Sequence, residues 1–257
     1  MHPTIQLALR AARSVTEHYD YLFERLDLAQ QDRQVPELLA SCSQRIEQSI
    51  ERQLVRAHPD ASMRGRHVSL QGSGEMCWAV DALVGEANLA AGYPAFALSI
   101  SVYVKDRLEH VVLLNPASNQ EFMASRGRGA ILNGRRIRVA SGWKLEEARL
   151  ALPVPSLRQR PLMMPRYLKA LQQLPVKSVF ASGCAGLDIC AIAAGQLDAG
   201  LFFGVEETEL APFLLVLKEA GGLAGDLSGA PQLSADGVLL VTNAKAFRSL
   251  VSQFKAV

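Results

Sequence analysis

One carboxylate stands at the end of an apolar run in the first half of the chain. The run Trp78-Ala-Val-Asp81 leads directly into a turn that contains Gly85 and Glu86. A hard cation such as Mg²⁺ prefers oxygen ligands, and a rigid strand end holds such ligands in place. The three positions after Asp81 carry Ala, Leu and Val, which offer no side-chain oxygen. The segment therefore has the setting of a metal site and lacks most of its ligands.

Length and composition describe a compact folded chain without a strong charge bias. The chain has 257 residues, 49% of them hydrophobic, which is typical of a globular protein with a substantial core. A formal net charge of +2 favours neither an anionic nor a cationic partner. Arginines cluster after Phe122 without interleaved aromatic residues, so we interpret them as a solvated face and expect no nucleic-acid partner. These arginines are Arg126, Arg128, Arg135, Arg136 and Arg138.

The cysteines and the N-terminal residues bear on the cellular compartment. The four cysteines form no C-x-x-C pair, so we expect small apolar core residues rather than a zinc site or a disulfide framework. Arg10 and Arg13 interrupt the N-terminal apolar pattern, which is unlike a signal peptide or a membrane span. We therefore expect a protein of the reducing cytoplasm that does not enter a membrane.

The first half of the chain is predicted to contain helices followed by an antiparallel meander. Apolar residues recur at helical spacing over 3–27 and again over 36–57, where Pro36 suits a first helical turn. Asn133-Gly134 is a tight-turn signature between two short strands. Further strands are predicted at 77–81, 95–104, 108–114 and 120–125.

The second half alternates helices with strands, which favours layered packing of helices against sheets. The predicted helices cover 166–174, 184–195, 209–220 (with Thr208 as N-cap) and 244–254, and the strands 148–152, 177–181, 198–203, 222–226 and 238–242. A proline-rich stretch at 153–165 is the only candidate boundary, and it is too short to separate independent domains. We therefore expect one domain over 1–257, with halves of roughly 1–150 and 151–257.

Several ordered motifs resemble the inositol monophosphatase family, especially its bacterial extragenic-suppressor branch. The segment Trp78–Asn88 is similar to the family pattern W-x-x-D-P-[IL]-D-G-T-x-N, and Gly183–Asp188 is similar to G-S-A-A-L-D. Other similar segments are Tyr93-Pro94 with the strand after it, Ser125–Ala130, Leu132–Gly134, Ala194-Gly195 with Asp198, and Glu219–Gly222. The resemblance covers nearly the whole chain. It implies an α/β fold, the layered αβαβα sandwich of the inositol monophosphatase and fructose-1,6-bisphosphatase type, commonly as a homodimer.

The resemblance also implies a site, residue by residue. Family members bind Mg²⁺ through carboxylates and use an activated water to attack a phosphomonoester. Two acidic positions are kept, Asp81 and Glu209, and these are the catalytic and metal-binding candidates, together with the backbone carbonyl of Leu83. The other family ligand positions carry Ser43, Arg66, His67 and Val84, and the substrate-recognising glutamate is replaced by Phe202.

The implied pocket has lost most of its negative charge. Six family carboxylates are reduced to two, and Arg66 adds a positive charge, so the formal charge rises from −6 to −1. Mg²⁺ needs several anionic oxygens, and a guanidinium keeps its proton. We therefore expect no cofactor, or weakly bound Mg²⁺. One alternative is that Glu86, with Glu206 and Glu207, rebuilds a weak site; the other is that Glu206 and Glu207 form a solvated helix approach.

Arg66 and His67 have two interpretations. They hold a phosphate or another anion directly, or Arg66 pairs with Asp81 or Glu209 and closes the vacated pocket. Beyond these two residues, the candidate positions for substrate or anion binding are Gly85, Glu86, Gly183, Cys184 and Ala185.

Three functions follow as competing hypotheses. The first is a weak or inactive homologue that acts through protein binding; the extragenic-suppressor branch associates with transcription antitermination machinery and RNA polymerase. The second is an active Mg²⁺-dependent phosphomonoesterase that acts on inositol monophosphate or a related small phosphate ester through Asp81, Glu209 and Glu86. The third is a metal-free anion-binding module centred on Arg66 and His67.

Overall fold

The structure is a computed structural model that describes residues 2–154, 160–173, 175–230 and 237–254. The chain divides into two compact units, Met1–Gly134 and Arg135–Val257, which are described separately as the first and the second unit. The division lies in the turn before β8, earlier than the halves near residue 150 that the sequence indicated. The interpretation of the chain as one domain stays a prediction.

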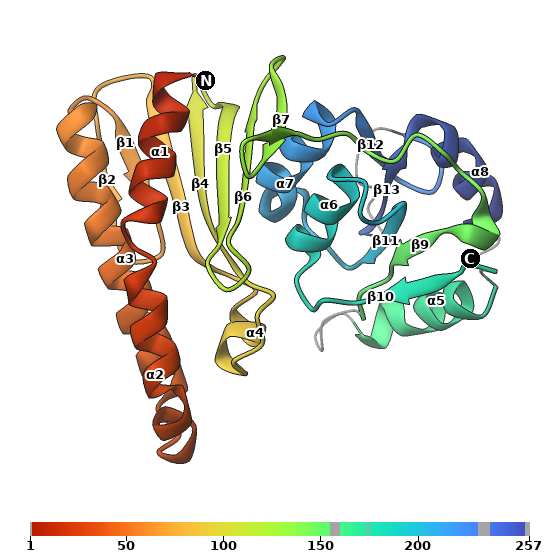
Figure 1. Cartoon of the computed structure of the whole chain (residues 1–257), viewed down its shortest axis with the longest axis horizontal. Coiled ribbons are helices and arrows are strands. Elements are labelled where there is room, and N and C mark those ends of the chain that lie inside the picture. Colours follow the sequence, from red (N-terminus) through yellow and green to blue (C-terminus); the bar gives the residue numbers. More distant parts are fainter. Residues whose placement is uncertain (1, 155–159, 174, 231–236, 255–257) are drawn as a thin grey trace. The chain divides into compact units, whose positions relative to one another are not determined.

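Helices cover one face of the sheet in the first unit (Figure 1). They are α1 (Pro3–Arg13), α2 (Glu17–Gln31) and α3 (Val35–Ala57). A further short helix, α4 (Glu86–Ala90), lies near the ends of the strands. The single helix predicted over 3–27 was wrong, because the chain breaks between α1 and α2. The hydroxyl groups of Ser14 and Thr16 donate hydrogen bonds to the carbonyl oxygens of Ala11 and Arg13. Such local bonds compete with the helical ladder and favour a break.

The first sheet has eight strands in the order β2-β1-β3-β4-β5-β6-β7-β8. Their bounds are β1 (Ser62–Arg64), β2 (Ser69–Leu70), β3 (Met76–Val84), β4 (Ala97–Val104), β5 (Arg107–Asn115), β6 (Gln120–Ser125), β7 (Gly129–Leu132) and β8 (Arg135–Arg136). From β3 to β7 each strand pairs antiparallel with the next one, which confirms the predicted meander. The predicted turn is also confirmed, since Asn133 and Gly134 both have positive φ angles of 47° and 77°.

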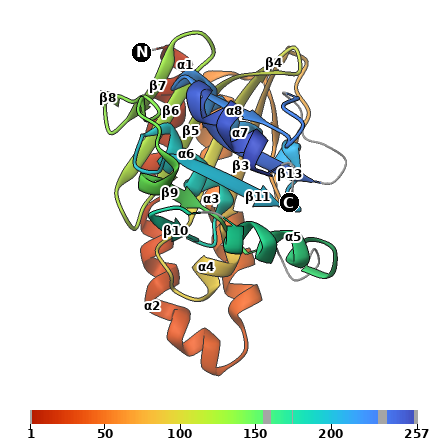
Figure 2. The ribbon, with the colours of Figure 1, turned by 90° about the vertical axis from the view of Figure 1, so that its right-hand side faces the viewer.

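The core of the first unit lies between its sheet and α1–α3. Leu98, Ile100 and Val102 alternate along β4 and pack against buried helical side chains such as Ile46 and Ile50. The α2–α3 hairpin continues beyond the ends of the strands (Figures 1 and 2). Packing of one helical face on one sheet face leaves the strand ends available for other contacts.

The second unit has a five-stranded sheet in the order β10-β9-β11-β13-β12. Its elements are the 3₁₀ turn η1 (Leu145–Glu147), β9 (Arg149–Ala151), α5 (Arg160–Gln173), β10 (Ser178–Phe180), α6 (Ala185–Ala193), β11 (Ala199–Phe203), α7 (Glu207–Glu219), β12 (Gly222–Gly225), β13 (Val238–Asn243) and α8 (Ala244–Phe254). These elements confirm the predicted alternation of helices and strands. Leu201 and Phe203 of β11 share a core with residues of α5 and α8. Gly200 lies against Ile192 of α6, so helices cover both faces of this sheet.

Two further sequence predictions can be compared with the fold. Thr208 is not the N-cap of α7: Glu206 has the extended backbone of an N-cap, and Thr208 already lies within the first helical turn. Cys42, Cys184 and Cys190 are buried and unpaired, as expected for core cysteines, and Cys77 is half-buried. Among the described residues, no helix is both long enough and apolar enough to span a membrane.

Tyr19 connects the helical layer to the end of β3. Its hydroxyl donates a 2.7 Å hydrogen bond to the carbonyl oxygen of Ala82, and the side chain is fully buried. Burial also raises the pKa of Tyr19 well above its ordinary value, so the group stays a neutral donor.

We expect Tyr19→Phe to lower the free energy of unfolding by about 1–2 kcal/mol, because the buried Ala82 carbonyl loses its donor. Urea unfolding measures this as a lower midpoint at an unchanged m-value. Tyr21→Phe is the matched control, since Tyr21 lies on the same helix and is 36% exposed. An equal effect of both substitutions would contradict a specific role for the Tyr19 hydroxyl.

Candidate functional site

The candidate site in the first unit is built on the C-terminal end of β3. The pairing of β3 with β4 is irregular between Asp81 and Val84, so the strand bends before it ends. Gly85 follows with a φ of 79°, a left-handed conformation that favours glycine. The Leu83 backbone N–H donates a 2.9 Å hydrogen bond to Asp81 Oδ1. The Asp81 carboxylate is thus oriented by its own turn.

The ionisation of Asp81 is subject to opposing influences. Burial is the largest influence on the pKa of Asp81 and raises it, while the hydrogen bond from the Leu83 N–H and the charge of the Arg66 guanidinium lower it. The Asp81 residue is nevertheless exposed by its accessible surface. A carboxylate that reaches water keeps much of its hydration, which limits the effect of burial on Asp81. Asp81 is therefore available as an anion at neutral pH.

A second carboxylate, Glu47 on α3, organises the loop beside Asp81. Its side chain is completely buried and accepts four hydrogen bonds. Three come from consecutive backbone N–H groups, those of Arg66 (3.1 Å), His67 (2.7 Å) and Val68 (2.9 Å). The fourth comes from the Ser43 hydroxyl at 3.0 Å. Glu47 was not among the predicted site residues, although a glutamate on the apolar face of a predicted helix indicates a buried carboxylate that needs hydrogen-bond donors.

The Glu47 carboxylate has no capacity left for another ligand. Two carboxylate oxygens offer about four lone-pair sites, and the four donors fill them. A Cβ at Gly65 would lie 2.5 Å from Glu47 Oε2, so the approach also requires glycine at this position. The backbone N–H groups that would help Arg66 and His67 to hold an external anion are consequently occupied by an internal one.

The Arg66 guanidinium forms its ion pair with Glu86. Arg66 Nη2 lies 2.7 Å from Glu86 Oε2, which corrects the predicted pairing with Asp81. Glu209 belongs to the second unit, and its pairing with Arg66 stays a prediction. The hydrogen bond to Glu86 is the largest cause that raises the pKa of Arg66. The two side chains are 49% and 44% exposed, so the pair stabilises the fold by no more than about 1 kcal/mol. Arg66 thus occupies one oxygen of Glu86 and places a positive charge where a cation would approach.

The remaining candidates in the first unit contribute no acidic oxygen. Val84 is a half-buried apolar residue at the end of β3, and the His67 side chain is exposed. The side chain of Leu83 is buried. Among the described residues, no three His, Cys, Asp or Glu side chains form a group that could hold a metal ion.

The other predicted site residues belong to the second unit. Gly183 has a φ of 81°, and Cys184 is the N-cap of α6, which begins at Ala185. Glu209 is exposed in the first turn of α7. Phe202 is fully buried in β11. The first unit thus contains Asp81, Leu83, Arg66 and Glu86, whereas the second unit positions Glu209 and the Gly183–Ala185 turn.

The sequence as a whole matches one protein family. The family model described as the inositol monophosphatase family matches residues 2–256. The chain belongs to the inositol monophosphatase family. The Nus factor SuhB of Pseudomonas aeruginosa is 36% identical over 98% of this chain and 96% of its own length. The putative Nus factor SuhB of Neisseria meningitidis serogroup B is 28% identical over 100% of this chain and 99% of its own.

Solved structures confirm the predicted α/β sandwich of the inositol monophosphatase family. The extragenic suppressor protein suhB from Bartonella henselae has a TM-score of 0.80 at 24% identity and covers 99% of both chains. The inositol monophosphatase from Anabaena has a TM-score of 0.79 at 24% identity, over 98% of this chain and 95% of that one. The predicted resemblance to the extragenic-suppressor branch is also confirmed by the SuhB relatives.

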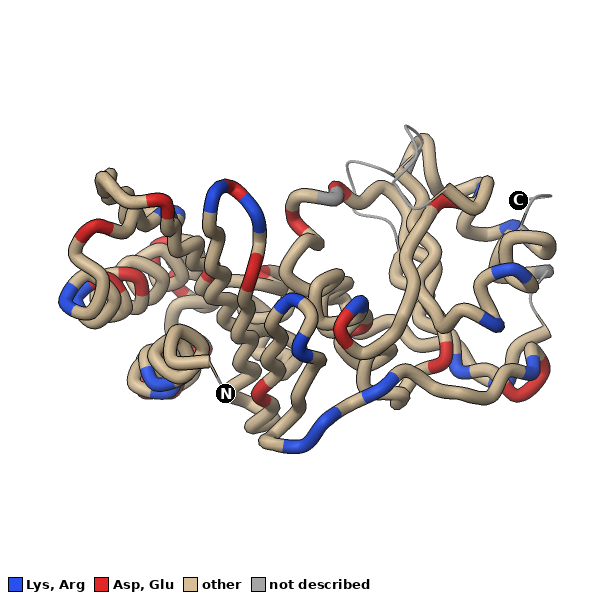
Figure 3. The backbone as a smooth tube through the Cα atoms, turned by 90° about the horizontal axis from the view of Figure 1, so that it is seen from above, with Lys and Arg blue, Asp and Glu red and all other residues tan. Residues whose placement is uncertain are grey.

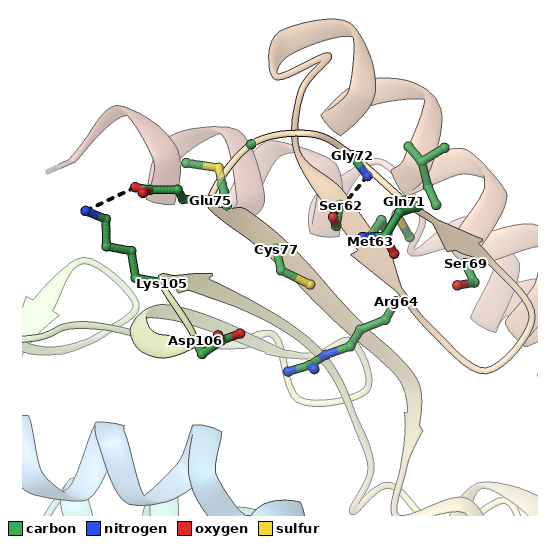
Figure 4. A pocket seen from close by; sticks show the side chains of 13 residues that line it. Ser62, Met63, Arg64, Ser69, Gln71, Gly72, Glu75, Cys77, Lys105 and Asp106 are labelled. Atoms are coloured by element: carbon green, nitrogen blue, oxygen red, sulfur yellow. Dashed lines mark hydrogen bonds and ion pairs between the residues drawn. The ribbon is translucent and has the colours of Figure 1, made fainter.

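Outside the family site, the first unit has a pocket of about 520 Å³ beside β1, β2 and the start of β3 (Figure 4). Lys105 Nζ lies 3.4 Å from Glu75, and Arg64 stacks over the ring of Tyr103 at 4.7 Å. Gly72 and Gly74 border this pocket, where a Cβ would lie 2.3 Å and 2.8 Å from the Asp60 carbonyl oxygen. Close packing thus explains the Gly72-Ser-Gly74 sequence.

Charges of both signs are spread along the backbone (Figure 3). Within the predicted arginine cluster, Arg126 donates hydrogen bonds of 3.0 Å and 2.7 Å to the Leu108 carbonyl oxygen. Arg135 and Arg136 are exposed in β8. At least one member of the cluster therefore supports the local fold, and the expectation of no nucleic-acid partner stays a prediction.

Asp188 is a buried carboxylate in the family motif of the second unit. It is 4% exposed, and its Oδ2 atom has no hydrogen-bond partner among the described residues. Burial raises the pKa of Asp188 to about 6, although hydrogen bonds from Ser182 lower it. The native state therefore holds a proton on Asp188 at a higher pH than the unfolded state does.

We expect Glu47→Gln to lower the free energy of unfolding by about 2–4 kcal/mol. The glutamine NH₂ group would face backbone N–H donors and leave some of them unpaired. Urea unfolding at pH 7 measures the loss. Glu37→Gln is the control, because this substitution makes the same chemical change at an exposed position of the same helix. A similar small loss for both variants would show that Glu47 does not organise the loop.

We expect Asp188→Asn to stabilise the protein by about 1–3 kcal/mol above pH 6, where wild-type Asp188 carries a buried charge. Because the folded-state pKa is raised, wild-type stability falls as pH rises from about 4 to about 6, and the gain from asparagine should vanish towards pH 4. Urea unfolding at several pH values tests this. A gain that does not vary with pH would exclude the ionisation of Asp188 as its cause.

Proposed function

We propose that this chain is a catalytically weak or inactive member of its family that acts through protein binding. The observation that carries the proposal is the Arg66–Glu86 ion pair, which places a guanidinium on the one acidic side chain suited to replace a lost ligand. Mg²⁺ would have to approach Glu86 beside the positive charge of Arg66. Apart from Glu86, Asp81 is the only acidic residue in the segment Trp78–Asn88.

The donor set on the first unit does not fit Mg²⁺. A tightly held Mg²⁺ needs near-octahedral oxygen ligands, usually with carboxylates among them. The oxygens of Glu47 are already filled by internal donors, and Val84 has none to offer. A cation near Arg66 is also repelled by the guanidinium. We therefore infer that metal-activated water is not generated efficiently here.

The same contacts argue against a metal-free anion site at Arg66 and His67. A phosphate in that position would have to compete with Glu86 for the Arg66 guanidinium. It would also lack the three backbone N–H groups that Glu47 already holds. None of these contacts argues against protein binding, which is therefore the hypothesis that we retain.

The relatives suggest the kind of partner. Full-length relatives in several bacteria are named Nus factor SuhB. By analogy we propose that the present chain associates with the transcription machinery in the cytoplasm, and that it does so as a homodimer. Fold likeness alone does not transfer function, so this partner needs a direct test.

We expect calorimetric titration of the wild-type chain with Mg²⁺ to show no saturable binding in the millimolar range, and no Mg²⁺-dependent phosphate release from inositol monophosphate. Restoring the family acids through Arg66→Glu, His67→Glu and Val84→Asp should raise the Mg²⁺ affinity by at least about tenfold. The control variant Arg10→Glu with Arg52→Glu makes the same change in net charge at exposed helix positions.

The outcomes separate the hypotheses. Saturable Mg²⁺ binding with phosphate turnover, both lost in Asp81→Ala, would establish an active phosphomonoesterase and overturn the proposal. An equal gain in the control variant would mean that overall charge, and not ligand restoration, decides the affinity. For the partner, purified chain and RNA polymerase with its antitermination factors should co-elute; failure to do so would reject the proposed association.

A further inference from the structure

A pocket of about 400 Å³ in the second unit lies outside the family site. It is lined by the segment Arg138–Ser141, by the turn at Ala220-Gly221 and by the start of α8 at Asn243–Lys245. The Val139 N–H donates a 3.1 Å hydrogen bond to the Ala220 carbonyl oxygen, which fixes the segment against the turn. The pocket is therefore assembled from three distant parts of the sequence.

The charged side chains that line this pocket all have the same sign. Arg138 and Lys245 are both exposed, and neither forms an ion pair with another described residue. No carboxylate is among the lining residues. A Cβ at Gly221 would lie 3.8 Å from Arg138 Nη1, which places the guanidinium beside the glycine backbone. The pocket thus presents two uncompensated cations, unlike the pocket beside β1, where basic and acidic residues alternate.

The side chain of Asn243 gives an independent indication that this pocket binds a ligand with a hydrogen-bond acceptor. It borders the pocket and is 5% exposed. Its Oδ1 caps α8 by accepting 2.9 Å hydrogen bonds from the Lys245 and Ala246 N–H groups. These two bonds fix the orientation of the amide, because only the oxygen can accept. The Nδ2 group then remains as a buried donor without a partner among the described residues, and a buried donor of this kind is costly to leave unpaired.

We propose that this pocket binds the phosphate group of a small phosphate ester. Arg138 and Lys245 supply charge-assisted hydrogen bonds from its two sides, and the N-terminal end of α8 adds a favourable dipole. Asn243, which borders the pocket, would add the buried Nδ2 group as a neutral donor.

The size of the pocket favours an ester over the free ion. A volume of about 400 Å³ is within the range of small-molecule sites and exceeds what one phosphate group fills. The other lining side chains are small and mostly apolar, among them Val139, Ala140 and Ala244. They leave room for an organic group next to the phosphate.

The test is a calorimetric titration of the full chain with glycerol 3-phosphate and, separately, with inorganic phosphate, at constant ionic strength and in chelator. We expect the ester to bind, and Arg138→Gln and Lys245→Gln each to weaken binding about five- to tenfold. Asn243→Asp keeps an oxygen that can cap α8 and replaces the donor with an anion, so it should abolish binding. Tighter binding of the ester than of inorganic phosphate supports a contribution from the organic group.

Two matched variants make the result specific. Arg248→Gln removes one positive charge from an exposed position on the same helix outside the pocket, and binding should change less than about twofold. Asp81→Asn should leave binding unchanged, which separates this pocket from the family site. Absence of ester binding in the wild type, or an effect of Arg248→Gln equal to that of Lys245→Gln, would each overturn the proposal.

Discussion

The buried carboxylate of Glu47 is the constraint on which the candidate site depends. A carboxylate enclosed by protein is tolerated only when hydrogen bonds replace the water that it loses. Here α3 carries the acceptor and the loop after β1 supplies three consecutive N–H donors. The loop is therefore held against the helix by its backbone, and its conformation does not depend on the side chains of Arg66 and His67.

This backbone anchoring explains how the site can change its side chains without losing its fold. Arg66 is free to extend towards Glu86, because the loop that carries it is fixed by other atoms. Asp81 is oriented by the Leu83 N–H, and the next carbonyl is held by Tyr19. Two groups of the strand end, Asp81 Oδ1 and the Ala82 carbonyl oxygen, are thus hydrogen-bonded by protein donors. A scaffold of this kind remains stable when ligand side chains are replaced, which is the physical basis for proposing a binding role.

Each unit has buried polar atoms without a hydrogen-bond partner among the described residues, and in the first unit these are Trp78 Nε1 and Ser101 Oγ. Asp188 and Asn243 are each buried with one atom that has no partner among the described residues. In native proteins such groups are uncommon and often mark a titrating or ligand-binding position. Asp188 responds by a raised pKa. Asn243 cannot titrate, and the ligand proposed for the pocket beside α8 would supply a partner. The Glu47 carboxylate of the first unit is thus fully hydrogen-bonded, whereas Asp188 and Asn243 of the second unit are not.

The sequence by itself determined the family, the α/β sandwich and most of the helices and strands, because apolar periodicity and turn residues are local signals. It also identified which ligand positions lack an acidic residue. It did not indicate the short β1, β2 and α4 or the break between α1 and α2. Only the tertiary structure decided which groups pair with the charged side chains. Glu47 accepts hydrogen bonds from loop N–H groups that lie nineteen or more residues away in sequence. Arg66 donates a hydrogen bond to Glu86. The pocket beside α8 likewise joins residues near 138, 220 and 243. Spacing along the chain cannot reveal such partners, since hydrogen bonds and ion pairs depend on distances that arise only when the elements pack.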